Sequence, residues 1–399
     1  MDIYTESLIA RIVYLRYKLK YAGYNKRREE CNKSILIVRP EGIGDMVYTI
    51  PFLRELKRSF PEYKIDLVCS PIEENMMELC PYINKLFVFD TRTKEHRFKT
   101  LLRRSIRFSK ENLIQGKYEM AIAPSYANPG GYIEAWLCFF SGAKRRIGMS
   151  EKVNEKKHKI FMGAYDIFFT DVLYNKELYH EVENGLNYIK YLGRKVESNQ
   201  LELWTSQEDR QAVDKMFKRM HIIGNDIKII VNLATSALNK DWPVAYYIQV
   251  SKMILKKYSV SFLLIGAGDK ARLYADEYLR SIPNVYDFVN KTTMRQTIEI
   301  MKQSDLYLGG DTGPLHIAAA CGLHGCVIYK NAQDYKGEEQ MNAACWFSPW
   351  KSAIQVIQPE HALAGCEYGC ETIDAHCILE VKPKQVYEEL VKQINDISK

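Results

Sequence analysis

The sequence predicts an α/β protein made of two parallel-sheet domains, preceded by a basic amphipathic helix. A chain of 399 residues exceeds the size of one ordinary hydrophobic core. Short apolar runs alternate with helical patterns, and this rhythm pauses and then restarts near the middle of the chain. We expect the N-terminal helix in residues 1–33, the first domain with a crossover in 34–205, and the second domain in 206–399.

The first domain begins where strand-like segments start to alternate with helical ones. We expect strands at SILIV, KIDLVCS, LFVFD and YEMAIAP, and helices at IPFLRELKRSF and YIEAWLCFFSG. Residues from about 144 to 204 are less regular, so we expect the crossover there. Strands that alternate with helices are typical of a parallel sheet covered by helices.

The second domain repeats the pattern. Strands are expected at DIKIIVNLA, VSFLLIGAG, NVYDFVN and DLYLGG, and helices at AYYIQVSKMILKKY, KARLYADEYLRSI and TMRQTIEIMKQ. Two such Rossmann-like domains are expected to face each other across a deep cleft. Neither domain carries the G-x-G-x-x-G fingerprint between a strand and a helix, which disfavours an NAD enzyme.

The N-terminal helical pattern combines apolar and basic side chains. It contains Leu8, Ile9, Ile12, Val13, Leu15 and Leu19 together with Arg11, Arg16, Lys18 and Lys20. Such a helix either packs against the body of the protein or attaches to an anionic membrane surface, and the sequence leaves both interpretations open.

The composition limits the location and the partners. No run approaches the roughly 18 to 20 apolar residues of a membrane span, and no signal peptide is recognisable, so we expect a cytoplasmic protein. Ten scattered cysteines suit reduced thiols. A net charge of +7 favours an anionic partner. Nucleic acid is disfavoured because basic and acidic residues are interleaved.

Three loops that follow expected strands carry the candidate chemistry, since ligands of open α/β sheets bind beyond the carboxyl ends of the strands. The first is RPEGIGDMVYTIP, in which Gly44 permits a tight turn and Asp45 precedes a helix. Asp45 fits an N-cap as well as a general base, and the spacing does not separate the two roles.

The second loop is VNLATSALNKDWP. Thr235 and Ser236 offer hydroxyl groups directly after a strand, and Lys240 offers a point charge suited to phosphate. A solvated lysine explains this segment equally well.

The third loop is GGDTGPLHIAAACG. Asp311 and Thr312 are placed to cap the next helix, and Gly313 lets the backbone approach a ligand. The helix amides and dipole then suit a diphosphate. In the plainer alternative, His316 packs inside the first turn of an ordinary strand–turn–helix unit.

Together these loops resemble the bacterial glycosyltransferase family 9 heptosyltransferases, which transfer heptose from ADP-heptose to the lipopolysaccharide core. The resemblance is carried by the following segments, in this order: ILIVRPEGIGDMVYTIPFLRELKRSFP, KYEMAIAPS, SGAKRRIGMS, YHEVENGLNYIKYLG, ATSALNKDWP and SDLYLGGDTGPLHIAAACG. It extends from about Ser34 to about Val386 and implies a glycosyltransferase B-type fold, with the acceptor on the N-terminal domain and the nucleotide sugar on the C-terminal one.

The resemblance also implies residue roles in an inverting transfer. Asp45 matches the general base, and Lys240 is expected to stabilise charge on the leaving phosphate. On the acceptor side, Arg39 matches a basic residue of the family that faces the phosphates or the acidic acceptor. Apart from the resemblance, we expect Gly44 and the basic side chain of Arg145 on the acceptor side, and a solvated basic turn is the alternative for Arg145. The donor side is expected to involve Thr235, Ser236, Lys240, Asp269, Asp311, Thr312, Gly313 and His316. Asp269 is assigned because the family often has an acidic residue for the ribose hydroxyls after the corresponding strand.

No metal or other cofactor is expected in the reaction, because no D-x-D pair is placed to hold a divalent ion on the diphosphate. The expected partners are the nucleotide sugar, a core glycan and, peripherally, the inner membrane. A related transferase with another donor or a protein acceptor is an alternative, and so is a non-catalytic sugar-nucleotide-binding module, which would have no need for Asp45. Cys366, Cys370 and Cys377 lie close to His376, but their spacing matches no familiar four-ligand pattern and favours free thiols over a metal.

Overall fold

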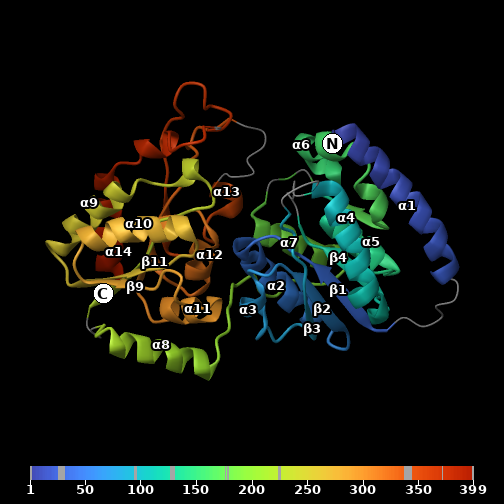
Figure 1. The fold of residues 1–399 in the computed structure, drawn as a ribbon, viewed down its shortest axis with the longest axis horizontal. Helices are drawn as coiled ribbons and strands as arrows, with labels where there is room; N and C mark the ends of the chain where they lie inside the picture. Colours follow the sequence, from blue (N-terminus) through green and yellow to red (C-terminus); the bar gives the residue numbers. More distant parts are fainter. Residues whose placement is uncertain are drawn as a thin grey trace. The chain divides into compact units, whose positions relative to one another are not determined.

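The chain folds into two compact units, Met1–Asn199 and Gln200–Lys399, in a computed structural model (Figure 1). The described residues are 2–25, 32–93, 97–125, 131–175, 177, 179–222, 226–336, 344–370 and 372–397. Each unit contains its own six-stranded sheet. The two units divide a few residues before the expected boundary at 205/206.

The sheet of the first unit is parallel throughout and has the strand order β3-β2-β1-β4-β5-β6. The central strands β1 and β4 are fully buried along their length, because helices cover both faces of the sheet. The strands are β1 (Ser34–Val38), β2 (Lys64–Cys69), β3 (Lys85–Val88), β4 (Met120–Ala123), β5 (Arg145–Met149) and β6 (Asp171–Leu173).

The helices of the first unit vary from one turn to six. Longer helices are α1 (Ile3–Asn25), α2 (Ile43–Ser59), α4 (Arg97–Phe108), α5 (Ile133–Phe140) and α7 (Glu181–Tyr191), and shorter ones are α3 (Glu74–Met77), α6 (Glu155–Phe161), Ser109–Leu113, Ile114–Gly116, Glu151–Val153 and Asp166–Phe168. Helices α2 and α7 pack against each other, which brings the start of α7 to the loop after β1.

Helix α1 uses one face to pack on the first unit. Its Tyr14 and Tyr17 rings lie 5.5 and 5.1 Å from the rings of Phe139 and Phe140 on α5, and Figure 1 shows α1 running beside α5. The opposite face carries exposed apolar side chains, which are Tyr4, Leu8, Ile12, Leu15 and Leu19. The helix therefore packs against the body and still presents a second apolar face.

The second unit repeats the same topology. Its parallel sheet has the order β12-β11-β10-β7-β8-β9. In both sheets the strand order reverses between two neighbouring central strands, which are β1 and β4 in the first sheet and β7 and β10 in the second. Ligands of doubly wound sheets bind at such switch points. The strands are β7 (Ile227–Asn232), β8 (Val260–Leu264), β9 (Val285–Asp287), β10 (Leu306–Gly310), β11 (His324–Ile328) and β12 (Ile354–Ile357).

Helices cover both faces of this second sheet. They are α8 (Gln207–Arg219), α9 (Val244–Leu255), α10 (Asp269–Ser281), α11 (Met294–Lys302), α12 (Gly313–Ala320), α13 (Ala344–Phe347) and α14 (Pro383–Ile397), with short helices at Leu238–Lys240 and Cys377–Glu380. Helix α14 returns to pack on α9 and β11, so the chain end completes the core of this unit. Among all described residues, no helix is both long and apolar enough to cross a membrane.

Residues 144–204, where we expected an irregular crossover, contain regular secondary structure. Residues 144–204 contain β5, β6 and α7, so the first sheet has two more strands than the apolar pattern indicated. Strand β5 begins with two arginines and β6 has three residues, and neither carries the continuous apolar run by which the central strands are recognised.

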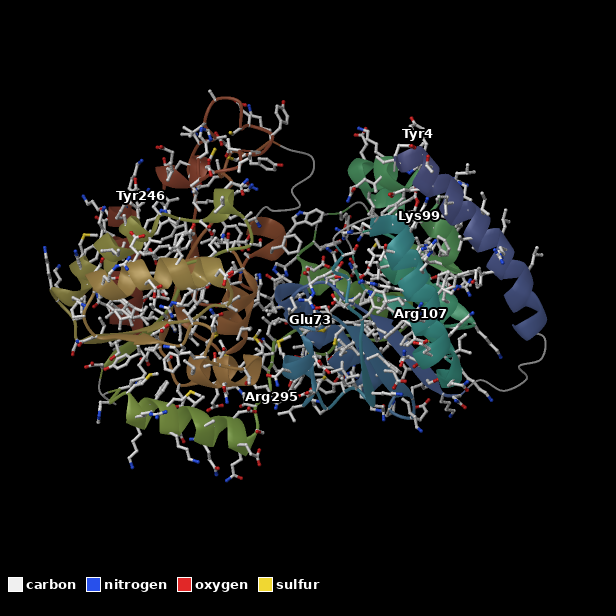
Figure 2. All side chains as sticks on the ribbon, in the orientation of Figure 1. Tyr4, Glu73, Lys99, Arg107, Tyr246 and Arg295 are labelled. Atoms are coloured by element: carbon white, nitrogen blue, oxygen red, sulfur yellow. The ribbon has the colours of Figure 1, made fainter. Side chains whose placement is uncertain are left out.

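Glu73 is a fully buried carboxyl group in the turn after β2 (Figure 2). The backbone N–H of Ser70 donates to its Oε2 at 2.6 Å. Burial raises the pKa of Glu73 from 4.5 to about 7, and the nearby charge of Asp45 acts in the same direction.

This shift predicts a pH-dependent stability. The folded protein holds the Glu73 proton up to about pH 7 whereas the unfolded chain releases it near 4.5, so the free energy of unfolding should fall as the pH rises through this window. Glu73→Gln keeps an acceptor for Ser70 and does not titrate. Between about pH 5 and about pH 8, the free energy of unfolding measured in urea should fall by up to about 3 kcal/mol more in wild type than in the variant. Parallel losses in both proteins would contradict the assignment.

Candidate functional site

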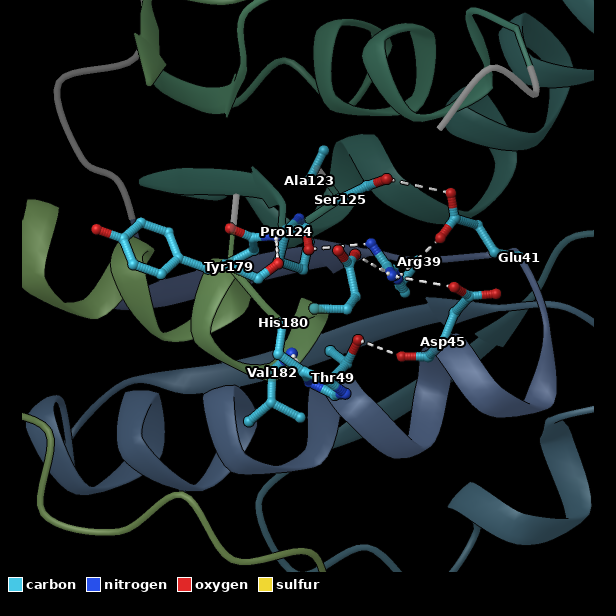
Figure 3. A network of polar contacts seen from close by, with 12 residues as sticks. Arg39, Glu41, Asp45, Thr49, Ala123, Pro124, Ser125, Tyr179, His180 and Val182 are labelled. Atoms are coloured by element: carbon cyan, nitrogen blue, oxygen red, sulfur yellow. Dashed lines mark hydrogen bonds and ion pairs between the residues drawn. The ribbon is translucent and has the colours of Figure 1, made fainter. Parts of the chain in front are cut away.

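A buried arginine organises the carboxyl edge of the first sheet. Arg39 follows β1, and its side chain is 1% exposed. Its Nε lies 2.9 Å from Glu41, and its Nη2 lies 2.7 Å from Glu181 and 3.4 Å from Asp45 (Figure 3). Its Nη1 donates to the carbonyl of Pro124, directly after β4, at 3.0 Å. One guanidinium thus connects the loops after β1 and β4 with the first turns of α2 and α7.

The charges of this network depend on one another. Burial alone would lower the pKa of Arg39, but Glu41, Glu181 and Asp45 hold it well above its usual value. Burial raises the pKa of Glu41 well above its usual value despite the neighbouring Arg39. Glu41 also accepts the Ser125 hydroxyl at 3.2 Å. The network therefore keeps its cation charged.

Asp45 differs from the other carboxylates by its position in α2. Gly42 is the N-cap of this helix, and Asp45 is its third residue, so the N-cap interpretation of Asp45 is wrong. A Cβ on Gly42 would lie 3.1 Å from Asp45 Oδ2, which explains a glycine at the cap. The Asp45 side chain is 35% exposed against 3% for Glu181, so Asp45 presents an oxygen to solvent while remaining within reach of Arg39.

The three residues predicted for the acceptor side do not lie together in the structure, because Gly44 and Arg39 lie near Asp45 and Arg145 does not. Gly44 lies beside Asp45 in the first turn of α2. Arg39 is buried and ion-paired, and its geometry suits holding Asp45. Its contact with an acceptor stays a prediction.

Arg145 lies at the wrong end of the sheet for the predicted role. It begins β5 and aligns through Met120 with Ile35, four residues before Arg39. At about 3.3 Å per residue, roughly 13 Å of strand separates the two levels. Arg145 pairs instead with Asp171 at 2.8 Å.

Glu181 is the residue of this network that sequence reasoning undervalued. Both Glu181 and its neighbour His180 lie in the segment YHEVENGLNYIKYLG, and the sequence alone assigns neither a role. His180 is the N-cap of α7, where its Nδ1 accepts the Val182 N–H at 3.2 Å and its ring meets the edge of Tyr48. Glu181 is buried, and a buried charge needs a partner, but this burial is visible only in the structure.

In the second unit, Lys240 and Asp311 meet at the carboxyl edge of the sheet. Lys240 Nζ lies 3.1 Å from Asp311 Oδ2. Their loops follow β7 and β10, which are hydrogen-bonded neighbours. A Cβ on Gly310 would lie 2.7 Å from Thr235 Cγ2, so a glycine at this position permits the two loops to approach each other.

The two hydroxyl residues predicted after β7, Thr235 and Ser236, have different environments in the structure. Thr235 Oγ1 donates to the carbonyl of Ala237 at 2.8 Å, and its backbone N–H donates to Asp241 at 2.7 Å. Asp241 also accepts from Lys270 at 2.6 Å. The Thr235 side chain thus shapes the turn, while Ser236 is exposed and presents its hydroxyl to solvent.

The segment after β10 forms a helix start as predicted, although no side-chain hydrogen bond caps it in the described part of the chain. Thr312 occupies the N-cap of α12, but its Oγ1 accepts from Asn232 Nδ2 at 2.8 Å, and in the described part of the chain its side chain makes no capping bond. The first amides of α12, from Gly313 onward, therefore receive no side-chain cap from Thr312. His316 is buried within the helix.

Two further residues flank this edge. Asp269 is exposed at the start of α10, which follows β8, the neighbour of β7. Lys330 follows β11, on the other side of β10, and sequence reasoning missed it. Burial and then the charge of Lys240 lower the pKa of Lys330. Its position after a strand of the same sheet was the available signal.

Comparisons with known proteins agree with this architecture. Residues 107–343 match the model of glycosyltransferase family 9 (heptosyltransferase), and this range includes Glu181, Lys240 and Asp311. The lipopolysaccharide core heptosyltransferase OpsX of Haemophilus influenzae is 21% identical over 310 residues, which cover 76% of this chain and 81% of that protein.

Solved structures share the fold. A family 9 glycosyl transferase from Veillonella parvula superposes with a TM-score of 0.74 at 17% identity, over 92% of this chain and 99% of that one. The E. coli ADP-heptose lipopolysaccharide heptosyltransferase II gives 0.65 at 16% identity, over 92% and 100%. Both confirm the expected two-sheet α/β fold. Because the family model matches more than half of the chain, this protein belongs to glycosyltransferase family 9, the heptosyltransferase family.

Proposed function

We propose that this protein transfers a heptose from ADP-heptose to a hydroxyl group of a lipopolysaccharide core acceptor, with inversion at the anomeric carbon. Membership of the heptosyltransferase family supports the reaction class. The printed names of similar proteins include a lipopolysaccharide core enzyme and an ADP-heptose enzyme. The single observation that carries the proposal is the Lys240–Asp311 pair beside the start of α12.

The second unit suits the donor diphosphate. Lys240 supplies a cation held by Asp311, Ser236 supplies an exposed hydroxyl, and the start of α12 supplies the Gly313 N–H with a favourable dipole. Pro314 has no N–H, and the Leu315 N–H already donates to the Thr312 carbonyl at 3.0 Å. As the bond from the anomeric carbon to the phosphate oxygen breaks, the leaving ADP takes the electron pair and gains negative charge. These fixed donors stabilise that charge, and they do so without a divalent metal or another cofactor in the reaction.

The first unit suits the acceptor hydroxyl. Asp45 takes the proton of the acceptor O–H as that oxygen forms the new bond to the anomeric carbon. Arg39, paired with Asp45 and Glu181, orients the Asp45 carboxylate. In this mechanism Arg39 is a positioning residue and Asp45 is the catalytic base.

Helix α1 suits an anionic membrane surface. Its outward face carries Leu8, Ile12, Leu15 and Leu19 at helical spacing, and the exposed Arg16 and Lys18 add positive charge to this helix. Arg11 is also exposed, but it donates to the carbonyl of Met162 at 2.7 Å. Tyr4, which is 73% exposed at the start of the helix, extends the apolar stripe of the outward face (Figure 2). Apolar burial combined with basic side chains favours a bilayer that contains acidic lipids, so we propose peripheral attachment to the cytoplasmic face of the inner membrane.

Asp45→Asn tests the base. The variant keeps the shape and a hydrogen-bond acceptor but cannot take up the proton, so kcat should fall roughly 10²- to 10⁴-fold while ADP binding is retained. ADP release from ADP-heptose with a panel of truncated lipopolysaccharide acceptors measures turnover. Glu119→Gln, which removes a carboxylate at the amino edge of the same sheet, serves as the control. Near-normal turnover of Asp45→Asn would refute the base, and failure of wild type with every ADP-heptose stereoisomer would refute the donor.

Lys240→Ala tests the phosphate contact. Loss of a charge-assisted hydrogen bond should weaken ADP binding roughly 10- to 100-fold and slow transfer. Calorimetric titration with ADP measures the affinity, and omission of Mg²⁺ and other added divalent ions from the transfer assay should leave the wild-type rate unchanged. Lys252→Ala removes an exposed lysine in the last turn of α9 and should behave as wild type. Unchanged affinity in Lys240→Ala would count against the assigned role.

A triple variant, Leu8→Gln, Ile12→Gln and Leu15→Gln, tests membrane attachment. Wild type should co-sediment with vesicles that contain phosphatidylglycerol and much less with pure phosphatidylcholine. Each buried leucine contributes roughly 1.5–3 kcal/mol, so the triple variant should bind at least about tenfold more weakly. Leu273→Gln, which alters an exposed leucine on α10, controls for a general loss of apolar surface. Equal binding by the triple variant and wild type would exclude this face.

A further inference from the structure

A cluster of sulfur and nitrogen ligands lies between β12 and α14. Cys366, Cys370, His376 and Cys377 each offer a ligand atom, and these atoms all lie within 4.8 Å of one another. The three cysteines are buried. The spacing in the sequence favours free thiols, but the fold brings these side chains together in a way that spacing does not convey.

The distances around His376 are those of a coordination sphere. Its Nδ1 lies 3.5 Å from Cys366 Sγ, 3.7 Å from Cys370 Sγ and 3.5 Å from Cys377 Sγ. A ring nitrogen has one proton or one lone pair, so hydrogen bonding does not account for three such contacts at once. In a tetrahedron with Zn–S about 2.3 Å and Zn–N about 2.0–2.1 Å, the nitrogen–sulfur edge is about 3.6 Å.

We infer that Cys366, Cys370, Cys377 and Nδ1 of His376 bind a structural Zn²⁺. Four protein ligands close the coordination shell, which is the mark of a structural rather than a catalytic zinc site. Binding converts three thiols to thiolates and releases their protons, so the occupied site carries one net negative charge. Lys330 lies beside it and donates to the carbonyl of Cys370 at 2.8 Å, which places a cation next to that charge.

The surroundings suit a bound ion. Ala362 and Leu363 pack on the cysteines and form an apolar cover. Gly365 and Gly369, with φ of +83° and +136°, give the chain the turns that bring Cys366 and Cys370 together. Apart from the short helix that starts at Cys377, the described residues between β12 and α14 form no helix or strand. A metal cross-link supplies the stability that a segment of this kind lacks.

The site also contacts the loop that carries Lys240. Asn239 Nδ2 donates to the carbonyl of Thr372 at 2.7 Å, directly beside Lys240. Zinc binding therefore stiffens the Lys240 loop, and this consequence for the donor rests on the proposed function. The presence of zinc does not rest on it.

The metal content of the purified full chain tests the site. Elemental analysis should find one zinc per chain in wild type and in Cys321→Ser, which alters a cysteine outside the cluster. Zinc should fall to background in Cys370→Ser and Cys377→Ser. Chelation should lower the Tm of wild type and added Zn²⁺ should restore it. Should the serine variants fail to fold, replacement of zinc by Co²⁺ in wild type provides a second readout, the absorption bands of a tetrahedral cobalt thiolate.

The outcomes separate this inference from the proposed transferase activity. Folded wild type that lacks zinc and takes none up when Zn²⁺ is supplied would overturn the site, and iron in place of zinc would overturn the identity of the metal. ADP affinity that falls on chelation and returns with Zn²⁺ supports the link to Lys240, whereas unchanged affinity would overturn that link. Zinc content and cobalt absorption do not depend on heptose transfer, so either proposal can fail without the other.

Discussion

The first unit depends on the burial of one guanidinium. Arg39 lies where β1 ends, and its partners come from the loop before α2, from α2 itself, from the loop after β4 and from α7, 142 residues away. A buried cation without partners would be strongly unfavourable, so these segments must all be in place together. The network therefore couples completion of the sheet to the position of Asp45.

The second unit reaches a comparable arrangement by other means. Asn232 at the end of β7 donates to Thr312, and Gly310 leaves room for Thr235, so the loops after β7 and β10 approach each other closely. This proximity places Lys240 against Asp311. Both sheets thus use the same topological switch point, one to collect carboxylates around an arginine and the other to collect cations and amides.

Much of the fold was predictable because its central strands are continuous apolar runs. SILIV and LYLGG are buried on both faces, and each is followed by the loop that carries candidate chemistry. Strands β5 and β6, the last two of the first sheet, were not predictable from the same signal. The placement of Arg145 shows a second limit, because a basic residue beside a strand is informative only when the end of the strand is known.

Contacts between distant residues were the least predictable part of the site. The sequence identifies Asp45 and Lys240 as candidates, but it does not indicate that Glu181 reaches Arg39 or that Asp311 pairs with Lys240. The cysteine cluster shows the same limit, since irregular spacing hid ligand atoms that the fold brings within 4.8 Å of one another.

The Arg39 network also explains why Asp45, rather than its neighbours, suits the proposed base. Glu181 and Glu41 lie 2.7 and 2.9 Å from the guanidinium, whereas Asp45 lies at 3.4 Å. Glu181 and Glu41 are also less exposed than Asp45, and a buried carboxylate cannot reach a substrate. Among these residues, Asp45 combines the weakest pairing with the greatest exposure, while Arg39 still limits the orientations of its carboxylate.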